Sequence, residues 1–384
     1  MLVLFICAFS FLACGKAART GDIADAAARK GTAARVLLEQ FMPEAMKDGL
    51  VKIAVLDNQK KGDNSRQFIE GCVSEGRSMG FTVDAFVSGA DENRCREIAD
   101  GIARADYDGL IFAHGRVDFS YDILKPIADK GIHIVTFETL PYRDGKSING
   151  LITTFQDDYH LARLSLETLI SLCGGEERPP RVLRIGCDPG ILFLDRRAWE
   201  FDKMANEGKI TEAAFIKLDG LGNPHGAAWA AVAAILHRFP RQSVDALWVP
   251  WDEFAGGCAE ALARAGRQDI KMVSIGVSND DIRLMQLHAP VWLANAAVDP
   301  KIVGTVTMRI LSARLAGEKL HDTFSFDPQL LKTGDLNHAV TAANLSVMLP
   351  DWGEGNGVFD RYQWMIDLKA AVGKSLRIPA AAAQ

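Results

Sequence analysis

The sequence has no excess of positive charge, which argues against nucleic acid as a partner. Its 43 Lys and Arg residues are outnumbered by 49 Asp and Glu residues, and the formal net charge is −6 at pH 7. The basic residues are scattered rather than grouped in runs. A protein that follows a phosphate backbone needs a continuous positive surface, and this chain offers none.

Cysteine is also scarce, and the spacing of the seven Cys argues against a zinc cluster because no Cys-x-x-Cys pair occurs. Two of them, Cys7 and Cys14, lie in an apolar N-terminal segment. The others are widely separated: Cys72, Cys95, Cys173, Cys187 and Cys258. Most of these five fall on apolar positions of expected helices or strands, so we expect small buried residues and no metal site, although export would permit a disulfide.

Motifs of hydrolases and nucleotide-using enzymes are missing as well. No G-x-S-x-G, H-E-x-x-H, G-x-x-x-x-G-K-[ST] or G-x-G-x-x-G stands at a strand-to-helix turn. We therefore expect a protein that binds a small molecule, with no catalytic residue and no cofactor.

One apolar run at the N-terminus has the length of a signal peptide. Residues 1–13 (MLVLFICAFSFLA) are uncharged, too few to span a bilayer as a helix, and followed by small residues. We interpret residues 1–15 as an export leader, which predicts a periplasmic location. The box Leu12-Ala13-Cys14-Gly15 allows lipid attachment at Cys14, and ordinary cleavage near Gly15 is an equal alternative.

The remaining composition is that of a soluble globular protein with a large core. Hydrophobic residues make up 48% and charged residues 24% of 384 residues, enough for about two domains. A polar lead over 16–48 contains an expected helix at 33–47, and strands then alternate with helices. The first set of strands is expected at 51–56, 81–87, 109–113 and 133–137, with helices at 65–79, 91–104 and 121–130.

The alternation then repeats, which predicts a second α/β unit with a parallel sheet and right-handed crossovers. Strands are expected at 182–187, 212–218, 246–249, 272–277 and 291–296, and helices at 157–173, 195–206, 226–238, 252–265, 280–286 and 300–316. We assign 51–150 and about 278–296 to lobe 1, and 151–277 and about 297–319 to lobe 2. The alternation ends there, so 320–384 is expected to be an extension packed on the lobes.

The segment LWVPWDEFAGGCAEALARAGR (247–267) indicates where a ligand would bind. A short apolar strand breaks into Pro-Trp-Asp-Glu and a helix follows, which sets an aromatic ring and two carboxylates at the carboxyl end of a strand. Open α/β sheets bind small molecules at this end.

Four segments, in order, resemble the ribose- and galactose-type periplasmic sugar-binding proteins of ABC importers. They are VKIAVLDNQKKGDNSRQFIEGCVSEGRSMGF, YDGLIFAHGRVDFSYDILKPIADKGIHIVTFET, LWVPWDEFAGGCAEALARAGR and ANAAVDPKIVGTVTMRILSARLAGEKL. The resemblance covers roughly 51–319. It implies the type I periplasmic binding protein fold: two Rossmann-like lobes with parallel sheets, joined by a multi-strand hinge. It also implies a monomer that captures a sugar or polyol and delivers it to an inner-membrane permease.

The resemblance places one set of candidate ligand-binding residues in the first lobe. The loop after the first strand contributes Asn58 and Asn64, although Asn64 could instead cap the following helix. Glu138 falls where the family has an Asp, but Thr139 falls where the family has an Arg, so a donor is lost. His114 and its neighbour Arg116 could replace that donor, or could be solvated surface residues.

The second lobe contributes a larger set. Phe193, Asp195 and Arg197 match a loop where the family has an Arg ligand, with an intrahelical ion pair as the alternative. Asn223 stands at a strand-to-helix turn and could equally be a turn or cap residue.

The later candidates follow the remaining strands. Trp251 stands at the position of a sugar-binding Asn and Asp252 at that of an Asp, which could also cap its helix. Ser278 and Asn279 fall at an Asp position, and Asp299 lies near a Gln position.

Two other classes share this architecture. One is the effector-binding lobe of a transcription regulator, which would normally follow a helix-turn-helix, and the other is an exported sugar-processing enzyme. Pentoses, hexoses, polyols and furanosyl signalling compounds all remain open as ligands.

Overall fold

The structure is a computed structural model that describes residues 39–47, 50–59, 62–173, 178–218, 222–289, 291–349, 352 and 362–377. The expected leader, with Cys7 and Cys14, lies outside the described residues, and so does the first part of the expected helix at 33–47, residues 33–38. The described part of that helix region contains a short turn, η1 (Glu44–Met46). None of the described helices is both long and apolar enough to cross a membrane.

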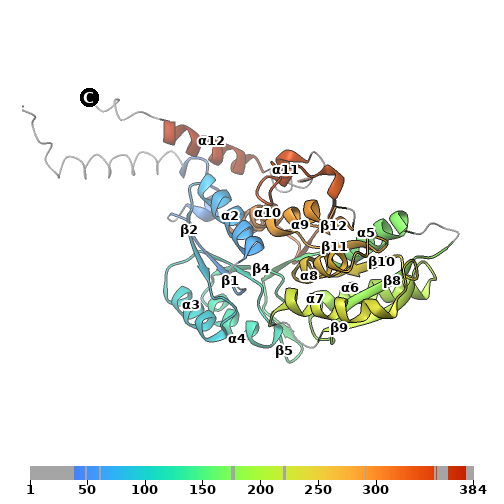
Figure 1. Cartoon of the computed structure of the whole chain (residues 1–384). Helices are drawn as coiled ribbons and strands as arrows, with labels where there is room; N and C mark the ends of the chain where they lie inside the picture. Colours follow the sequence, from blue (N-terminus) through green and yellow to red (C-terminus); the bar gives the residue numbers. More distant parts are fainter. Residues whose placement is uncertain are drawn as a thin grey trace, which may run out of the picture.

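The first lobe is a six-stranded parallel sheet between two pairs of helices (Figure 1). Its strands lie in the order β13-β7-β4-β3-β1-β2. They are β1 (Lys52–Asp57), β2 (Thr82–Val87), β3 (Gly109–Ala113), β4 (His133–Phe137), β7 (Ile152–Gln156) and β13 (Thr323–Phe326). The helices α2 (Asp63–Ser78) and α10 (Pro300–Leu315) cover one face, and α3 (Glu92–Arg104) and α4 (Val117–Ala128) cover the other.

The second lobe repeats this plan, with strand order β14-β12-β11-β10-β8-β9. Its strands are β8 (Arg181–Cys187), β9 (Thr211–Leu218), β10 (Ala246–Val249), β11 (Lys271–Ile275), β12 (Trp292–Ala297) and the antiparallel β14 (Gln329–Lys332). Helices α5 (Asp158–Cys173) and α6 (Leu192–Asn206) cover one face; α7 (Pro224–Ile235, continued by η2, Leu236–Arg238), α8 (Asp252–Arg264) and α9 (Asn279–Leu287) cover the other. The prediction of two α/β lobes with parallel sheets is confirmed.

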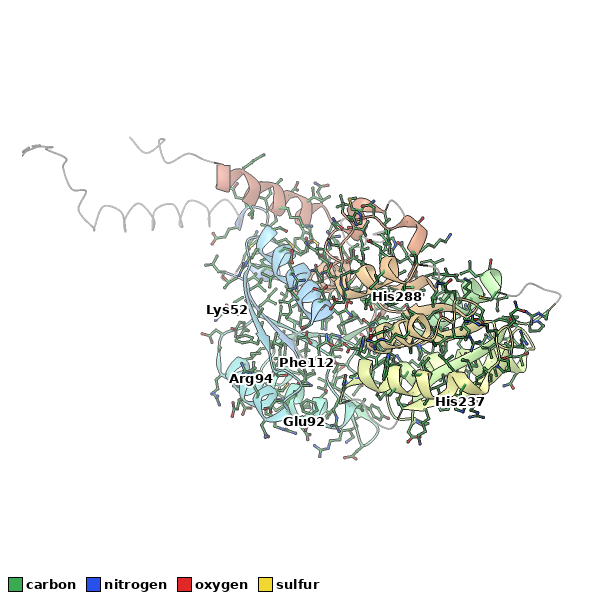
Figure 2. All side chains as sticks on the ribbon, viewed as in Figure 1. Lys52, Glu92, Arg94, Phe112, His237 and His288 are labelled. Atoms are coloured by element: carbon green, nitrogen blue, oxygen red, sulfur yellow. The ribbon has the colours of Figure 1, made fainter. Side chains whose placement is uncertain are left out.

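The apolar runs that became the inner strands β1, β3, β4, β10 and β11 are buried on both faces of their sheets, as inner strands of parallel sheets require. Phe112 of β3 is fully buried in the first lobe, whereas Arg94 and His237 lie exposed on the two lobes (Figure 2). In the second lobe the buried Trp248 donates its indole N–H to Ser165 at 2.8 Å, so that this large ring leaves no unpaired polar atom in the core. The five described cysteines are free thiols, and Cys72, Cys95 and Cys258 are buried, which agrees with their expected packing role.

The expected assignment of the later segments to the lobes is wrong. We expected 278–296 in lobe 1 and 297–319 in lobe 2, but β12 pairs with β11 in the second sheet, and α10 packs against α2 in the first lobe. Gly71 and Gly304 permit the close contact of these two helices, since a Cβ on either residue would collide with backbone atoms of the other helix. Alternation along the chain shows that a strand exists but not which sheet it joins.

The chain crosses between the lobes at three described points. One of them lies close to the expected boundary at 297, and none lies at the expected boundaries near 150 and 277. The chain passes from β7 to α5 at Asp157, from β12 to α10 at Val298 and Asp299, and from β13 to β14 at Asp327 and Pro328. Because β7 pairs with β4, the first lobe continues to 156 rather than ending near 150.

The C-terminal extension contacts both lobes. After β13 and β14, the segment with η3 (Thr333–Asp335) and α11 (Leu345–Met348) packs on the second lobe through the buried Val340, Ala342 and Leu345. Helix α12 (Gln363–Arg377) packs on the first lobe through Met365 and Leu368. A short hairpin of β5 (Tyr142–Arg143) and β6 (Lys146–Ser147) completes the described elements.

Candidate ligand-binding cleft

A cavity of about 710 Å³ lies between the two lobes. The first lobe lines it with residues that follow β1, β3 and β4 and with the end of β7. The second lobe contributes residues that follow β8, β10 and β11, and the crossing into α10 adds Val298 and Pro300. The carboxyl ends of strands from both sheets therefore face the same space, which is where open α/β sheets bind ligands.

The two lobes also touch directly beside this cavity. The side-chain amide of Asn64, at the start of α2, donates to the carboxylate of Asp252, at the start of α8, with 3.3 Å between the atoms. The backbone N–H of Asn279 donates to the Asp63 carboxylate at 2.8 Å. These hydrogen bonds join first-lobe and second-lobe helix ends, and they would be broken if the lobes moved apart.

His114 follows β3 and is held by a buried carboxylate. Its Nδ1 lies 2.8 Å from Oδ1 of Asp57, which is fully buried and also accepts a hydrogen bond from the Ser65 hydroxyl. Burial alone would lower the pKa of His114, but the charge of Asp57 and the hydrogen bond to it outweigh burial and raise the pKa above its usual value. With Nδ1 donating to Asp57, Nε2 of His114 can donate to a ligand when the ring is protonated and accepts a hydrogen bond when the ring is neutral.

Glu138 follows β4 and presents a carboxyl group that burial makes costly to ionise. One of its oxygens accepts the backbone N–H of Gln156 at 2.6 Å. Burial, followed by the nearby charge of Asp158, raises the pKa of Glu138 to about 7.

Two side chains of the cleft share an uncommon backbone conformation. His114 and Glu138 both have positive φ, 58° and 47°. Non-glycine residues are strained there, and such strain is concentrated at functional sites.

Arg197 is the buried cation of the second lobe. It is only 3% exposed, and it donates to Asp158 at 3.0 Å and to the carbonyl of Pro250 at 2.7 Å. Its guanidinium lies 4.9 Å from the centre of the Phe193 ring. The alternative of an ion pair within its own helix is therefore wrong, because its acidic partner belongs to α5.

Trp251 stands in an aromatic group, with Phe193 and Phe254 edge-on to its ring at 5.5 and 5.1 Å between ring centres. Trp251 also occupies the cap position of α8, so Asp252 lies in the first turn and is not the capping residue. Burial, followed by the charge of Glu253, raises the pKa of Asp252 to about 6. Gly276 permits this packing, because an added Cβ would lie 2.7 Å from Cγ of Asp252 and φ here is +107°.

Seven of the predicted site residues line the cavity: Asn64, His114, Glu138, Phe193, Arg197, Trp251 and Asp252. The other six do not, and most of them bind backbone N–H groups at turns or helix starts. The side-chain oxygen of Asn223 accepts the N–H of Gly226, the Ser278 hydroxyl accepts the N–H of Asp281, and the Asp299 carboxylate accepts the N–H groups of Lys301 and Ile302. Short polar side chains satisfy the free N–H groups of a helix start. The same residue types therefore occur at helix caps and at binding sites.

The remaining three are held elsewhere. The Asp195 carboxylate accepts the N–H of Gly190 at 2.9 Å. Asn58 is buried and bonded to the Ser88 hydroxyl at 2.5 Å, behind His114. The side-chain oxygen of Asn279 accepts the N–H of Ala342 in the C-terminal extension at 2.9 Å.

Several cavity residues were not predicted. Phe155 and Gln156 end β7, whose apolar–polar alternation was not recognised as a strand. Phe68, Leu140, Ile191 and Leu192 were passed over because apolar residues in helices and loops give no sequence signal of a binding role. The tertiary structure alone places them in the cleft.

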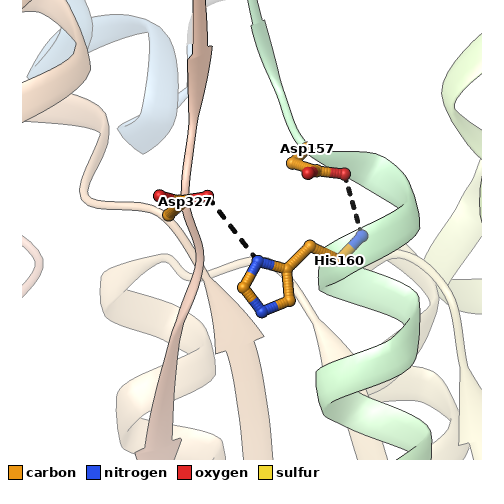
Figure 3. A group of neighbouring side chains, drawn as sticks. All are labelled: Asp157, His160 and Asp327. Atoms are coloured by element: carbon orange, nitrogen blue, oxygen red, sulfur yellow. Dashed lines mark hydrogen bonds and ion pairs between the residues drawn. The ribbon is translucent and has the colours of Figure 1, made fainter.

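Asp157, His160 and Asp327 form the group of potential metal ligands found in the part of the chain that the structure describes (Figure 3). Asp157 accepts the backbone N–H of His160 at the start of α5, and His160 Nδ1 lies 3.6 Å from Asp327, which is 83% exposed. These contacts are those of a helix cap and a surface ion pair, and they link the first and third crossings between the lobes.

Comparisons with known proteins agree on one family. A model of the periplasmic binding protein domain matches residues 44–319. A sugar ABC transporter structure from Yersinia enterocolitica subsp. enterocolitica is 31% identical, with 86% of this chain and 98% of that chain covered and a TM-score of 0.72.

Two further structures are similar. A 5-methylthioribose transporter solute-binding protein from Thermotoga lettingae, in complex with 5-methylthioribose, is 25% identical over 87% of this chain and 99% of its own, with a TM-score of 0.70. A glucose-galactose binding protein from Geobacillus stearothermophilus shares the fold at 18% identity, over 75% of this chain and 99% of its own, with a TM-score of 0.62. No curated protein matches the sequence.

Proposed function

Since the chain belongs to the periplasmic binding protein family, we propose that it captures a sugar or polyol between its lobes and delivers it to the permease of an ABC importer. The single observation that carries this proposal is the composition of the cleft. Glu138 from one lobe, Arg197 and Asp252 from the other, and the ring of Trp251 all line one cavity. A sugar needs this combination, since its hydroxyls bind charged and amide groups and its C–H faces pack on aromatic rings.

Closure of the lobes on the ligand would make the function possible. A ligand shifts the equilibrium toward the closed form only through contacts that both lobes make with it. The hydrogen bonds of Asn64 to Asp252 and of Asn279 to Asp63 join the lobes here and would support the closed form. A permease could then distinguish the closed protein from the open one.

The proposal places the protein outside the cytoplasm, where its family homologues are found. It includes the export leader, with either a lipid on Cys14 or ordinary cleavage near Gly15, and a monomeric protein. Mass spectrometry of the exported protein would decide between a lipidated N-terminus at Cys14 and an ordinary cleaved one.

A thermal melting screen tests the ligand class. A ligand that binds the folded state alone stabilises it by RT ln(1 + [L]/Kd), which is about 2.7 kcal/mol at a hundredfold excess over Kd. We expect at least one pentose, hexose, polyol or furanosyl compound to raise the melting temperature by several degrees. If none of them does so, the sugar-binding proposal fails. Conversion of the best compound to product by the purified protein would instead support an enzyme.

Ligand affinity should rise with pH between about 5.5 and 8. The pKa of Glu138 is raised to about 7 and that of Asp252 to about 6. Both carboxyl groups are therefore mostly ionised at pH 8 and become protonated as the pH falls toward 5.5. Sugar hydroxyls donate best to ionised carboxylates, so we expect affinity at least tenfold higher at pH 8 than at pH 5.5. Isothermal titration calorimetry over this range measures the effect.

The stability of the ligand-free protein should change in the opposite direction. A carboxyl group whose folded-state pKa is raised binds more protons when folded than when unfolded, so the free energy of unfolding falls as pH rises from about 4.5 toward 7. In the Glu138→Gln variant, ligand affinity and the free energy of unfolding should both vary less with pH above pH 6. An affinity that stays flat or falls with rising pH would show that these carboxyl groups do not accept hydrogen bonds from the ligand.

A further inference from the structure

The mouth of the cleft carries an apolar rim that a plain sugar does not require. Val117 and Leu140 from the first lobe and Leu192 from the second line the cavity, although they are 42%, 39% and 45% exposed. Large apolar side chains left in water at a concave site indicate a surface that is covered when a partner or ligand binds. Both lobes contribute, so the covering group sits between them.

The polar groups of the cavity lie deeper. Arg197 is 3% exposed, and burial is the main influence on the pKa of both Glu138 and Asp252. The cavity therefore has a polar interior and an apolar entrance. Ile191 and Phe193, next to Leu192 in the chain, also line it and extend the apolar surface from the rim toward Trp251.

The space available also exceeds that of an unsubstituted pentose. A cavity of about 710 Å³ equals the volume of roughly two dozen water molecules at about 30 Å³ each. It lies within the range of about 300–1,000 Å³ typical of sites for larger organic ligands.

The charges of the cleft disfavour a phosphate as the additional group. Each cation that lines the described cavity has a carboxylate partner: His114 pairs with Asp57, Arg197 with Asp158, and Arg116 with Glu92 at 3.1 Å. Glu138 and Asp252 add two acidic groups. A sugar phosphate would enter a site with no uncommitted positive charge.

We propose that the ligand is a monosaccharide or polyol bearing an uncharged apolar substituent, such as an alkylthio or alkoxy group. Its hydroxyls bind Glu138, Arg197 and Asp252, and its substituent packs at the rim between Leu140 and Leu192. This inference rests on the proposed function, because it assumes that the polar end of the ligand is a sugar.

Calorimetry with the full exported chain tests the inference on matched sugars. The panel pairs ribose with 5-methylthioribose and galactose with methyl β-galactoside, and adds ribose 5-phosphate. We expect a substituted sugar to bind best, at least tenfold more tightly than its unsubstituted partner and with a more negative heat-capacity change, and ribose 5-phosphate to bind no better than ribose.

Two exposed rim residues supply the variants. Leu192→Ser and Leu140→Ser should remove most of the preference for the substituted sugar, measured as the ratio of the Kd values of the unsubstituted and substituted sugars. Leu172→Ser is the matched control, because Leu172 on α5 is 48% exposed and does not line the cavity.

The outcomes separate the two proposals. Equal affinity for each sugar and its substituted partner, tightest binding of ribose 5-phosphate, or an unchanged preference in both rim variants would overturn the inference and leave a sugar-binding protein. Absence of binding by every sugar in this panel and in the melting screen would overturn the proposed function itself.

Discussion

Trp251→Ala should weaken sugar binding by about 10- to 100-fold, a loss of roughly 1.4–2.8 kcal/mol in binding free energy. Its ring lines the cavity and is held by Phe193 and Phe254, so it offers a fixed apolar face to the C–H groups of a sugar. Rigid aromatic rings at the centre of a site carry a large share of binding energy. Calorimetry with the best compound from the melting screen measures the change in Kd.

The stability of this variant should fall much less than its affinity, because Trp251 is only partly buried. Trp199→Ala is the matched control: Trp199 is 54% exposed on α6 and contacts Tyr159 away from the cavity. Its affinity should equal that of the unaltered protein. If Trp251→Ala binds equally well, the ring does not contact the ligand.

Arg197→Met should have the largest effect on stability, with a loss of about 3 kcal/mol in the free energy of unfolding. The guanidinium is nearly fully buried and pairs with Asp158, which is itself 1% exposed. Without it the Asp158 carboxylate keeps only Arg196, at 3.4 Å, and lies near the charge of Glu138. Chemical denaturation at pH 7.5 measures the loss.

The same variant should bind sugar at least tenfold more weakly, and lowering the pH should restore part of its stability, because protonation removes the unpaired charge. Arg178→Met provides the control, since Arg178 pairs with Asp245 at the surface and is 57% exposed. Such a pair contributes at most about 1 kcal/mol. A loss in Arg197→Met no greater than in this control would show that Asp158 is adequately paired without Arg197.

The sequence was sufficient to predict most strands and helices. The apolar runs that became β1, β3 and β10 are buried on both faces, and such runs can be read directly from the residues. Strands β5, β6, β7, β13 and β14 were not predicted, and of these β13 and β14 are the edge strands of the two large sheets. Most residues of β13 and β14 are exposed or partly buried, and the buried positions of β7 include Thr153 and Thr154, so the hydrophobic pattern of these strands is weak.

The residues predicted to bind a ligand also divide into some that the structure places at the cavity and others that it places elsewhere. Trp251 stood out because an aromatic ring directly after a strand lies at the carboxyl end of the sheet, and Glu138 because it falls where the resembled family has an Asp. Asn223 was selected by its place at a strand-to-helix turn, and Ser278 and Asp299 by the resemblance, but the structure shows all three binding backbone N–H groups at helix starts. A polar residue at a strand-to-helix turn can cap or bind, and only the direction of its side chain distinguishes these roles.

The sequence by itself determined that this chain forms two α/β lobes, because hydrophobic periodicity and turn residues are local properties. Only the tertiary structure decided that β12 belongs to the second sheet and α10 to the first lobe, that Asp158 rather than Asp195 pairs with Arg197, and that Leu140 and Leu192 meet at one cavity. The physical reason is that these choices depend on contacts between residues distant in the chain, such as the close packing of α2 on α10, and no local pattern records them.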